Sequence, residues 1–498
     1  MPTLTEELAA WVADLRLDDI PARVVDFAVS QILAHVGALA AGARHDLGRR
    51  VVAAFGAPLG GDPKQSAYVL AALTMLLDYD DTVFAGHVSH STVGVPLAYA
   101  ESAGLDGPGL LVAVLAANET AARVTAAATL GHFRGQTAAH THLAGAVAAR
   151  GRAEAMAAPT LVDAWGLAFA MPPWSLTRAF MGSDAKVLTA ATPVRTGLDA
   201  CDAATAGLAG AADILEHPDG FLARFAEIPL PQAVGGLGRR WHTETLSIKV
   251  YPGCAYLDAA LDAAVTLHPR VQDRLDTVER VVVAASVFTA GMDARSRPYV
   301  HGPGTGVAAL NFSVPYNVAV ALMRGALVPA DFDADMVADP SVWGLAAKVE
   351  VAYDRDLTER ALLATAPVGA ALRTAGDAAT AWLAPMLGLE EQAAAALVAG
   401  GPEASFEDAE KAVGARVTVH FADGSTEEAA VDIALGAAGA RTRARHRGIA
   451  LAKYLTEASA WLGAERAREA AALVEGLADA GTAEVARLVE ILRAGIAR

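Results

Sequence analysis

Long stretches of the sequence predict helices whose apolar side chains cover most of the helix circumference. From residue 5 to about residue 245 one such segment follows another, and alanine supplies most of the apolar side chains. A helix that is apolar on nearly all sides is usually buried, and alanine favours helix formation. The sequence therefore predicts a large helical core. Its clearest helices are expected after Pro21 and over Ser66–Leu77, Gly109–Leu130, Thr141–Met156 and Asp199–Leu215.

The pattern changes near residue 275. Val278–Val283 and Ala347–Tyr353 are typical of strands, and Arg416–Phe421 alternates with period two before the turn Ala422–Ser425 and a second strand to Val431. That arrangement predicts a hairpin. Helical periodicity returns from about Gly448, and the alanine-rich stretch 359–412 is also expected to be helical.

We therefore predict a mainly α fold. A large all-helical domain begins the chain and is completed by the C-terminus, and a smaller α+β lid domain is inserted into it. The expected boundaries are 1–270 and 436–498 for the helical domain and 271–435 for the lid.

Charge and composition exclude several classes of protein. The formal net charge is −17, which argues against non-specific nucleic-acid binding. We expect no signal peptide, because the first residues lack a basic region followed by an apolar run. We also expect no membrane span, because the apolar stretches are interrupted by charged residues or proline. Cys201 and Cys254 are the only cysteines. Together these features predict a reduced, cytoplasmic protein.

The densest group of polar residues is Asp78–Thr82 followed by Gly86–Ser91, which holds three carboxylates and two imidazoles. Charged groups are costly to bury unless they are paired, so the cluster indicates a pocket. The alternative is a solvated helix end with capping residues. The spacing lacks a compact metal-binding pattern, and we expect no metal. The candidate site residues here are Asp78, Asp81, Thr82, His87 and His90.

Other candidates are scattered along the chain. His140 and His142 come at the start of a predicted helix, where a helix-end or core role is the alternative. Lys186 lies between apolar helices, although most lysines lie at the surface. Lys249 is close to the change of pattern, and domain junctions are common ligand sites. Tyr316 precedes a predicted helix, where it could simply be a helix-end aromatic residue.

These segments, taken in order, resemble the MmgE/PrpD family over nearly the whole chain. Each motif is weak alone, and their order makes the resemblance specific. The matching segments are Asp78–Thr82, the histidine-containing run to Pro96, the region of His142, Ala185-Lys186, Lys249–Cys254, Phe312–Tyr316 and Lys453-Tyr454.

The resemblance implies a homodimer with an active site between a helical domain and a lid, and with no metal or organic cofactor. By motif match, the site would be lined by Asp78, Thr82, His87 or His90, His140 or His142, Lys186, Lys249 and Tyr316. The family often has a histidine near the position of Asp258. An acid there would remove an anchor for a substrate carboxylate, which favours a specialised substrate over a tricarboxylate.

The expected activity is that of a carbon–oxygen or carbon–carbon lyase acting on a small carboxylate. Lys186 and Lys249 would stabilise an enolate-like charge, and one histidine, oriented by Asp78, would move a proton at carbon. Tyr316 would donate to a leaving hydroxyl or a carboxylate, while Asp81, Thr82 and His140 would bind substrate. The alternatives are an epimerase, isomerase or cyclase with the same groups, and a non-catalytic binding protein.

Overall fold

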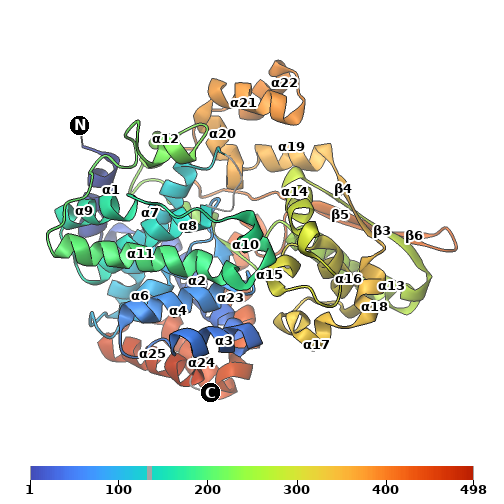
Figure 1. Cartoon of the computed structure of the whole chain (residues 1–498), viewed down its shortest axis with the longest axis horizontal. Helices are drawn as coiled ribbons and strands as arrows, with labels where there is room; N and C mark the ends of the chain where they lie inside the picture. Colours follow the sequence, from blue (N-terminus) through green and yellow to red (C-terminus); the bar gives the residue numbers. More distant parts are fainter. Residues whose placement is uncertain (1, 132–136, 497–498) are drawn as a thin grey trace.

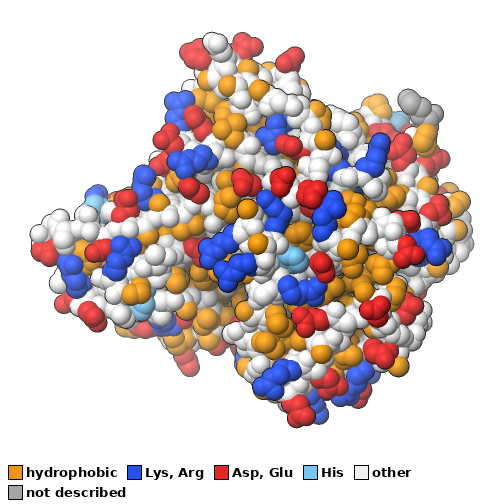
Figure 2. All heavy atoms as spheres, turned by 180° about the vertical axis from the view of Figure 1, so that it is seen from behind, with side chains coloured by type: hydrophobic (Ala, Val, Ile, Leu, Met, Phe, Trp, Pro, Cys, Tyr) orange, Lys and Arg blue, Asp and Glu red, His pale blue; other side chains and the backbone are white. Residues whose placement is uncertain are grey.

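The computed structural model describes residues 2–131 and 137–496, and it confirms a mainly helical protein. Figure 1 shows two parts: a large helical body, built from the first half of the chain and its C-terminal end, and a smaller part that contains the sheet. On the face in Figure 2, acidic, basic and apolar side chains are interspersed.

The helical body is built around buried helices that lie side by side. Helix α2 packs along α23, α7 along α8, and α11 against α8 and α4. Gly42 of α2 shows how close the contact is, because a Cβ atom there would lie 2.1 Å from the Leu73 carbonyl oxygen. The bounds of the main helices are α2 Ala22–Arg44, α4 Pro63–Met75, α7 Gly107–Ala127, α8 Thr137–Ala153, α11 Leu188–Thr205 and α23 Ala440–Leu462.

Shorter helices cover this body. Helices α24 and α25 pack together beside α23 and bring the C-terminus next to the N-terminal helices (Figure 1). The bounds are α1 Leu4–Asp14, α3 Asp46–Phe55, α5 Ser89–Thr92, α6 Gly94–Tyr99, α9 Ala158–Ala168, α10 Thr177–Gly182, α12 Phe221–Phe225, α24 Ala464–Glu475 and α25 Thr482–Ile496.

Helices α2 and α7 are long and apolar enough to span a membrane by length and composition. In the folded chain, however, 89% and 100% of their most apolar windows are buried inside the protein. Such extensive burial is typical of helices in the core of a folded protein. It also means that one chain covers its own apolar helices.

The smaller part contains a four-stranded sheet in the order β4-β3-β5-β6. Strand β3 is parallel to β4 and antiparallel to β5, with Val283 opposite both Val351 and Val417. Helix α13, Asp258–Val271, packs on the β5–β6 side, and α16, Val314–Arg324, packs against α13 and β4. The strands span β3 Val278–Ala285, β4 Val349–Tyr353, β5 Ala415–Phe421 and β6 Thr426–Val431, which confirms the predicted strands and hairpin.

The connections of the smaller part are helical. The bounds are α13 Asp258–Val271, α14 Val287–Ser296, α15 Val307–Leu310, α16 Val314–Arg324, α17 Ala334–Val337, α18 Pro340–Ala346, α19 Arg355–Leu363, α20 Ala370–Ala375, α21 Asp377–Leu387 and α22 Glu391–Val398. The prediction of a helical 359–412 was correct only to Val398, because 399–414 forms no helix. The predicted helix Asp199–Leu215 is also wrong in its bounds: α11 ends at Thr205, and Gly207 follows with φ +90°.

A two-residue ribbon joins segments that are far apart in sequence. Strand β1, Asp81–Thr82, pairs with β2, Ser247–Ile248, in antiparallel register. The Ile248 N–H donates to the Gly436 carbonyl oxygen at 2.8 Å. The ribbon therefore ties the Asp78–Thr82 segment to the chain just before Lys249.

Candidate active site

Asp78 lies in the tight turn that follows α4. Its backbone adopts the left-handed region with φ +53°, an uncommon conformation for a residue other than glycine. Such a conformation costs on the order of 1–3 kcal/mol and persists where the surroundings enforce it. Here the turn places a fully buried carboxylate between two lysines.

Lys186 and Lys249 reach Asp78 from different segments. Lys186 precedes α11 and donates to Asp78 Oδ2 at 2.8 Å. Lys249 follows β2 and donates to Asp78 Oδ1 at 2.6 Å and to the Asp78 carbonyl oxygen at 2.8 Å. Both lysine side chains are 1% exposed. Asp78 is thus the anion that brings the two ammonium groups together.

Asp80 is the second anion of the cluster. Its Oδ1 accepts from Lys249 Nζ at 2.7 Å, and its Oδ2 lies 2.7 Å from His87 Nδ1 and 3.2 Å from His90 Nε2. Asp78 Oδ1 lies farther from His87 Nδ1, at 3.6 Å. The histidine-orienting role expected of Asp78 therefore falls to Asp80, which sequence reasoning missed.

His87 differs from the rest of the cluster in its exposure. Its side chain keeps 25% of its surface accessible, whereas the side chains of Asp80 and His90 are fully buried. Lys249 Nζ lies 3.4 Å from His87 Nδ1. A substrate that reaches the cluster would therefore meet His87.

His90 and His142 form an inner layer. Their rings lie 5.2 Å apart, and their Nδ1 atoms bond to the hydroxyls of Thr74 and Ser91. Burial lowers the pKa of His142 well below its usual range, and His90 adds to the shift. His142 is therefore a neutral ring held close to His90.

The surroundings set the charges of the cluster. Burial disfavours the ionised form of Asp78, but Lys186 and Lys249 outweigh it and hold the carboxyl pKa below its usual range. Burial also opposes the charge of Lys249, but Asp78 and Asp80 raise the pKa of its ammonium. For Lys186, burial exceeds the attraction of Asp78, so its pKa is lowered. Lys249 is thus the firmly charged cation, and Lys186 gives up its proton more easily.

Lys411 brings a further cation from the smaller part. It lies in the non-helical segment before β5 and donates to Thr82 Oγ1 at 3.0 Å. Burial lowers its pKa to about 8 against the attraction of Asp258, which lines the same small cavity. Burial also raises the pKa of Asp258 well above its usual range. We expected Asp258 to remove an anchor for a substrate carboxylate. Lys411 lies beside Asp258 and supplies a cation at this place.

Lys453 of α23 is a further buried lysine next to the cluster. It donates to the Tyr79 carbonyl oxygen, and its Nζ lies 3.9 Å from the centre of the Tyr79 ring. Burial lowers its pKa to about 7, against the attraction of Asp80.

We expect Lys453 to make stability depend on pH. From about pH 7 to pH 10 the unfolded chain keeps this ammonium protonated, while the folded chain releases the proton. The unfolded state then binds more protons, so the free energy of unfolding rises with pH. Lys453→Met should remove up to about 1.4 kcal/mol per pH unit of that rise, measured by urea unfolding at pH 7, 8 and 9. Lys348→Met, in the smaller part, is the control, and parallel curves for wild type and Lys453→Met would contradict the expectation.

Two predicted site residues lie elsewhere. The Tyr316 hydroxyl donates to the Asp331 carbonyl oxygen, and its ring packs against Phe332 and Trp343. The ring of His140 packs edge-on against Phe221 and Phe225. The structure therefore does not bring Tyr316 or His140 to the cluster, and the expected proton donation by Tyr316 has no geometric basis. Asp81 lies beside the charged cluster, and its Oδ1 accepts a hydrogen bond from the Ser89 N–H at 3.2 Å.

Asp80, His87 and His90 also form a set of metal-ligand type, since one ligand atom of each lies within 4.8 Å of the others. The sequence spacing did not reveal this closeness. Both carboxylate oxygens of Asp80 are already engaged, one by the Lys249 ammonium and one by His87. A divalent ion would be placed beside that ammonium, so the donor set fits an ion-pair network better than a metal.

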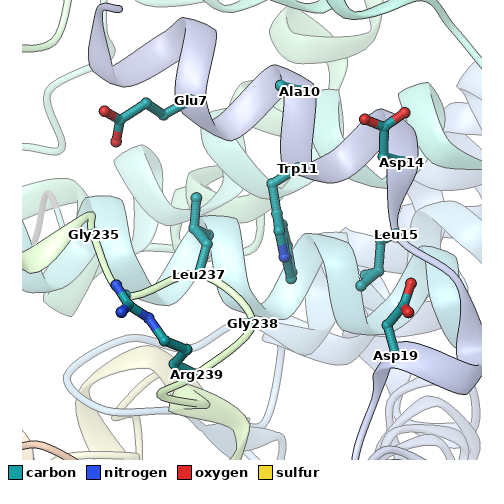
Figure 3. A pocket seen from close by; sticks show the side chains of 11 residues that line it. Glu7, Ala10, Trp11, Asp14, Leu15, Asp19, Gly235, Leu237, Gly238 and Arg239 are labelled. Carbon is teal, nitrogen blue, oxygen red and sulfur yellow. The ribbon is translucent and has the colours of Figure 1, made fainter.

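A separate hollow of about 620 Å³ lies between α1 and the loop 235–239. Figure 3 shows Trp11 and Leu237 near the middle of this hollow, with Glu7, Asp14, Asp19 and Arg239 around them. Its described lining includes no residue of the charged cluster, and we assign it no function.

The fold and the site define a class of two-part helical proteins. Its helical body is completed from both ends of the chain, its smaller part has a mixed sheet, and its buried centre holds lysines, aspartates and histidines. Family models place the chain more narrowly. The MmgE/PrpD N-terminal domain matches residues 6–232, and the MmgE/PrpD C-terminal domain matches residues 251–377. The chain belongs to the MmgE/PrpD family.

Two curated relatives are similar along most of their length. A cis-aconitate decarboxylase of Aspergillus terreus (strain NIH 2624 / FGSC A1156) is 26% identical over 399 residues, which cover 72% of this chain and 79% of the relative. A second cis-aconitate decarboxylase of Aspergillus terreus is 26% identical over 389 residues, or 70% and 77% of the two chains.

Proposed function

We propose that the protein is a cofactor-independent lyase that dehydrates or decarboxylates a small carboxylate-bearing molecule by proton transfer at carbon. One observation carries the proposal: a partly exposed imidazole, His87, is held by a buried carboxylate and lies 3.4 Å from the Lys249 ammonium. Membership in the MmgE/PrpD family and the similarity to two decarboxylases support a lyase.

His87 is the group that would move the proton. Because Asp80 accepts from His87 Nδ1, that nitrogen carries the hydrogen, and Nε2 is left with its lone pair for the substrate. An imidazole can both accept a proton from carbon and return it.

The lysines would stabilise the negative charge that develops beside the carboxylate. Lys249 keeps its charge, and its position is fixed by three acceptor atoms. A preorganised cation in a site shielded from water acts strongly on a developing enolate, because little reorganisation is needed. Lys411 and Thr82 would hold a carboxylate of the substrate.

An epimerase, isomerase or cyclase would use the same proton transfer, so it is the second candidate. A binding protein on this fold would need the cations but not the Asp80–His87 pair, which disfavours that alternative.

The test is exchange of carbon-bound hydrogen with solvent. In D₂O, NMR of a panel of di- and tricarboxylic acids, including cis-aconitate, is expected to show deuterium entry or product formation. EDTA should not stop the reaction, and His87→Asn should slow it by at least about 10²-fold. His217→Asn, at an exposed loop histidine, is the control. Binding of acids with neither exchange nor product would favour the binding protein instead.

We also propose a homodimer, on the family resemblance alone. The apolar helices α2 and α7 add no support, because one chain buries both of them.

A further inference from the structure

An apolar pocket of about 690 Å³ lies between the helical body and the smaller part. The helical body contributes Ala85 and Gly131, and the smaller part contributes Phe288, Met292 and the segment Pro367-Val368. A volume of this size is typical of sites for drug-sized ligands and exceeds what a small tricarboxylate needs.

The walls of this pocket are aromatic and aliphatic. The Tyr256 and Phe288 rings stack at 5.5 Å with an interplanar angle of 25°. Two charged side chains line the pocket among the described residues, and both have protein partners. Glu227 accepts from Trp382 Nε1 at 2.5 Å, and Arg295 donates to the Gly291 carbonyl oxygen at 2.9 Å. The chemistry of the pocket therefore suits an apolar group.

The pocket adjoins the charged cluster at two points. Ala85 lies in the turn closed by the bridge between Val83 and Gly86, and His87 follows this turn directly. On the other wall, the Tyr256 ring centre lies 5.7 Å from Lys411 Nζ. Two residues that line the pocket, Ala85 and Tyr256, are thus direct neighbours of the segment that carries His87 and of Lys411.

We propose that the substrate carries an aryl or branched-alkyl group that fills this pocket, in addition to the carboxylate that the cluster binds. This inference rests on the proposed function, because it takes the cluster to be the carboxylate site. It narrows the substrate class from small polycarboxylates to amphipathic carboxylic acids, since burial of an apolar group in a preformed apolar pocket favours binding.

The experiment compares succinate with 2-benzylsuccinate by isothermal titration calorimetry. The two acids share their carboxylates and differ by one benzyl group. We expect 2-benzylsuccinate to bind at least about ten-fold more tightly, because its ring leaves water for the pocket. Tricarballylate, which adds a third carboxylate instead of the ring, should not show this gain.

Variants of pocket residues test whether the tighter binding of 2-benzylsuccinate arises in this pocket. Phe288→Ala and, separately, Val368→Glu should reduce the benzyl advantage to less than about three-fold and leave succinate affinity within about two-fold. Leu208→Ala, at an exposed position after α11, is the matched control and should change neither value. Two variants are used so that misfolding of one does not decide the result.

The outcomes separate the two proposals. If succinate binds and the benzyl group adds nothing, or if the gain survives both pocket variants, the pocket inference is wrong while the carboxylate site stands. If no acid binds, or if Lys249→Met leaves all affinities unchanged, the proposed function fails and the inference fails with it.

Discussion

Lys249→Met is expected to lower kcat/KM by at least about 10²-fold, the loss typical when a preorganised charge is removed from a reaction centre. Methionine keeps much of the bulk and removes the ammonium, so the effect reports charge. Because Lys249 Nζ donates to Asp78 and Asp80, the variant also leaves both carboxylates without their common cation. A lower free energy of unfolding should therefore accompany the loss of turnover, and both are measured on the same preparation.

The matched control is Lys64→Met. Lys64 also contacts two carboxylates, Asp199 at 2.9 Å and Asp202 at 2.5 Å, but it lies at the surface and outside the cluster. Exposed ion pairs contribute about 0–1 kcal/mol, so this variant should keep normal turnover and nearly normal stability. Near-normal turnover in Lys249→Met would instead make Lys249 a structural residue and refute the mechanism.

Asp78→Asn is expected to destabilise the protein by roughly 3–5 kcal/mol, because it removes one partner from a buried charge network. Lys186 would then have lost its carboxylate partner in a fully buried position. Urea unfolding at pH 7 measures the change. Asp408→Asn, at an exposed aspartate, should stay within about 0.5 kcal/mol of wild type.

A double variant sharpens this prediction. Replacing both partners, in Asp78→Asn with Lys186→Met, should cost less than the sum of the two single losses, because neither charge is then left alone. Additive losses would mean that the pair has no energetic coupling, and the network described here would be wrong.

Much of the fold could be predicted because local patterns determine it. The β-branched run at Val278–Val283 and the turn at Asp423-Gly424 marked the sheet, and continuous apolar faces marked the buried helices. The errors come where local preference does not decide. Residues 399–414 are alanine- and glycine-containing but serve as a connection to β5, and α11 ends early at a left-handed glycine.

The site was harder to predict, because motifs name residues without fixing their direction. His140 and His142 are two positions apart on α8, so they point to nearly opposite sides of the helix, and only His142 faces His90. Tyr316 belongs to a matching motif but turns into the core of the smaller part. Asp80 could have been found from its place two residues after Asp78, whereas nothing in the sequence marks Lys411.

The ribbon of β1 and β2 fixes the position of Lys249, because it ties the chain just before this residue to the Asp78–Thr82 segment. The Lys249 ammonium is therefore held in the same buried cluster as Asp78 and Asp80.

The path of the chain has a consequence for synthesis on the ribosome. Helix α2 packs along α23, and Lys453 of α23 donates to the Tyr79 carbonyl oxygen. The first helices therefore cannot complete their packing until nearly the last helices have been synthesised. Domains usually fold as they emerge, N-terminal first. Here the nascent helical body stays open, with apolar faces uncovered, until the whole sheet-containing part has been translated. A chain released before Ala440 would therefore lack both a closed core and a complete charge centre, and it would be a substrate for chaperones and proteases.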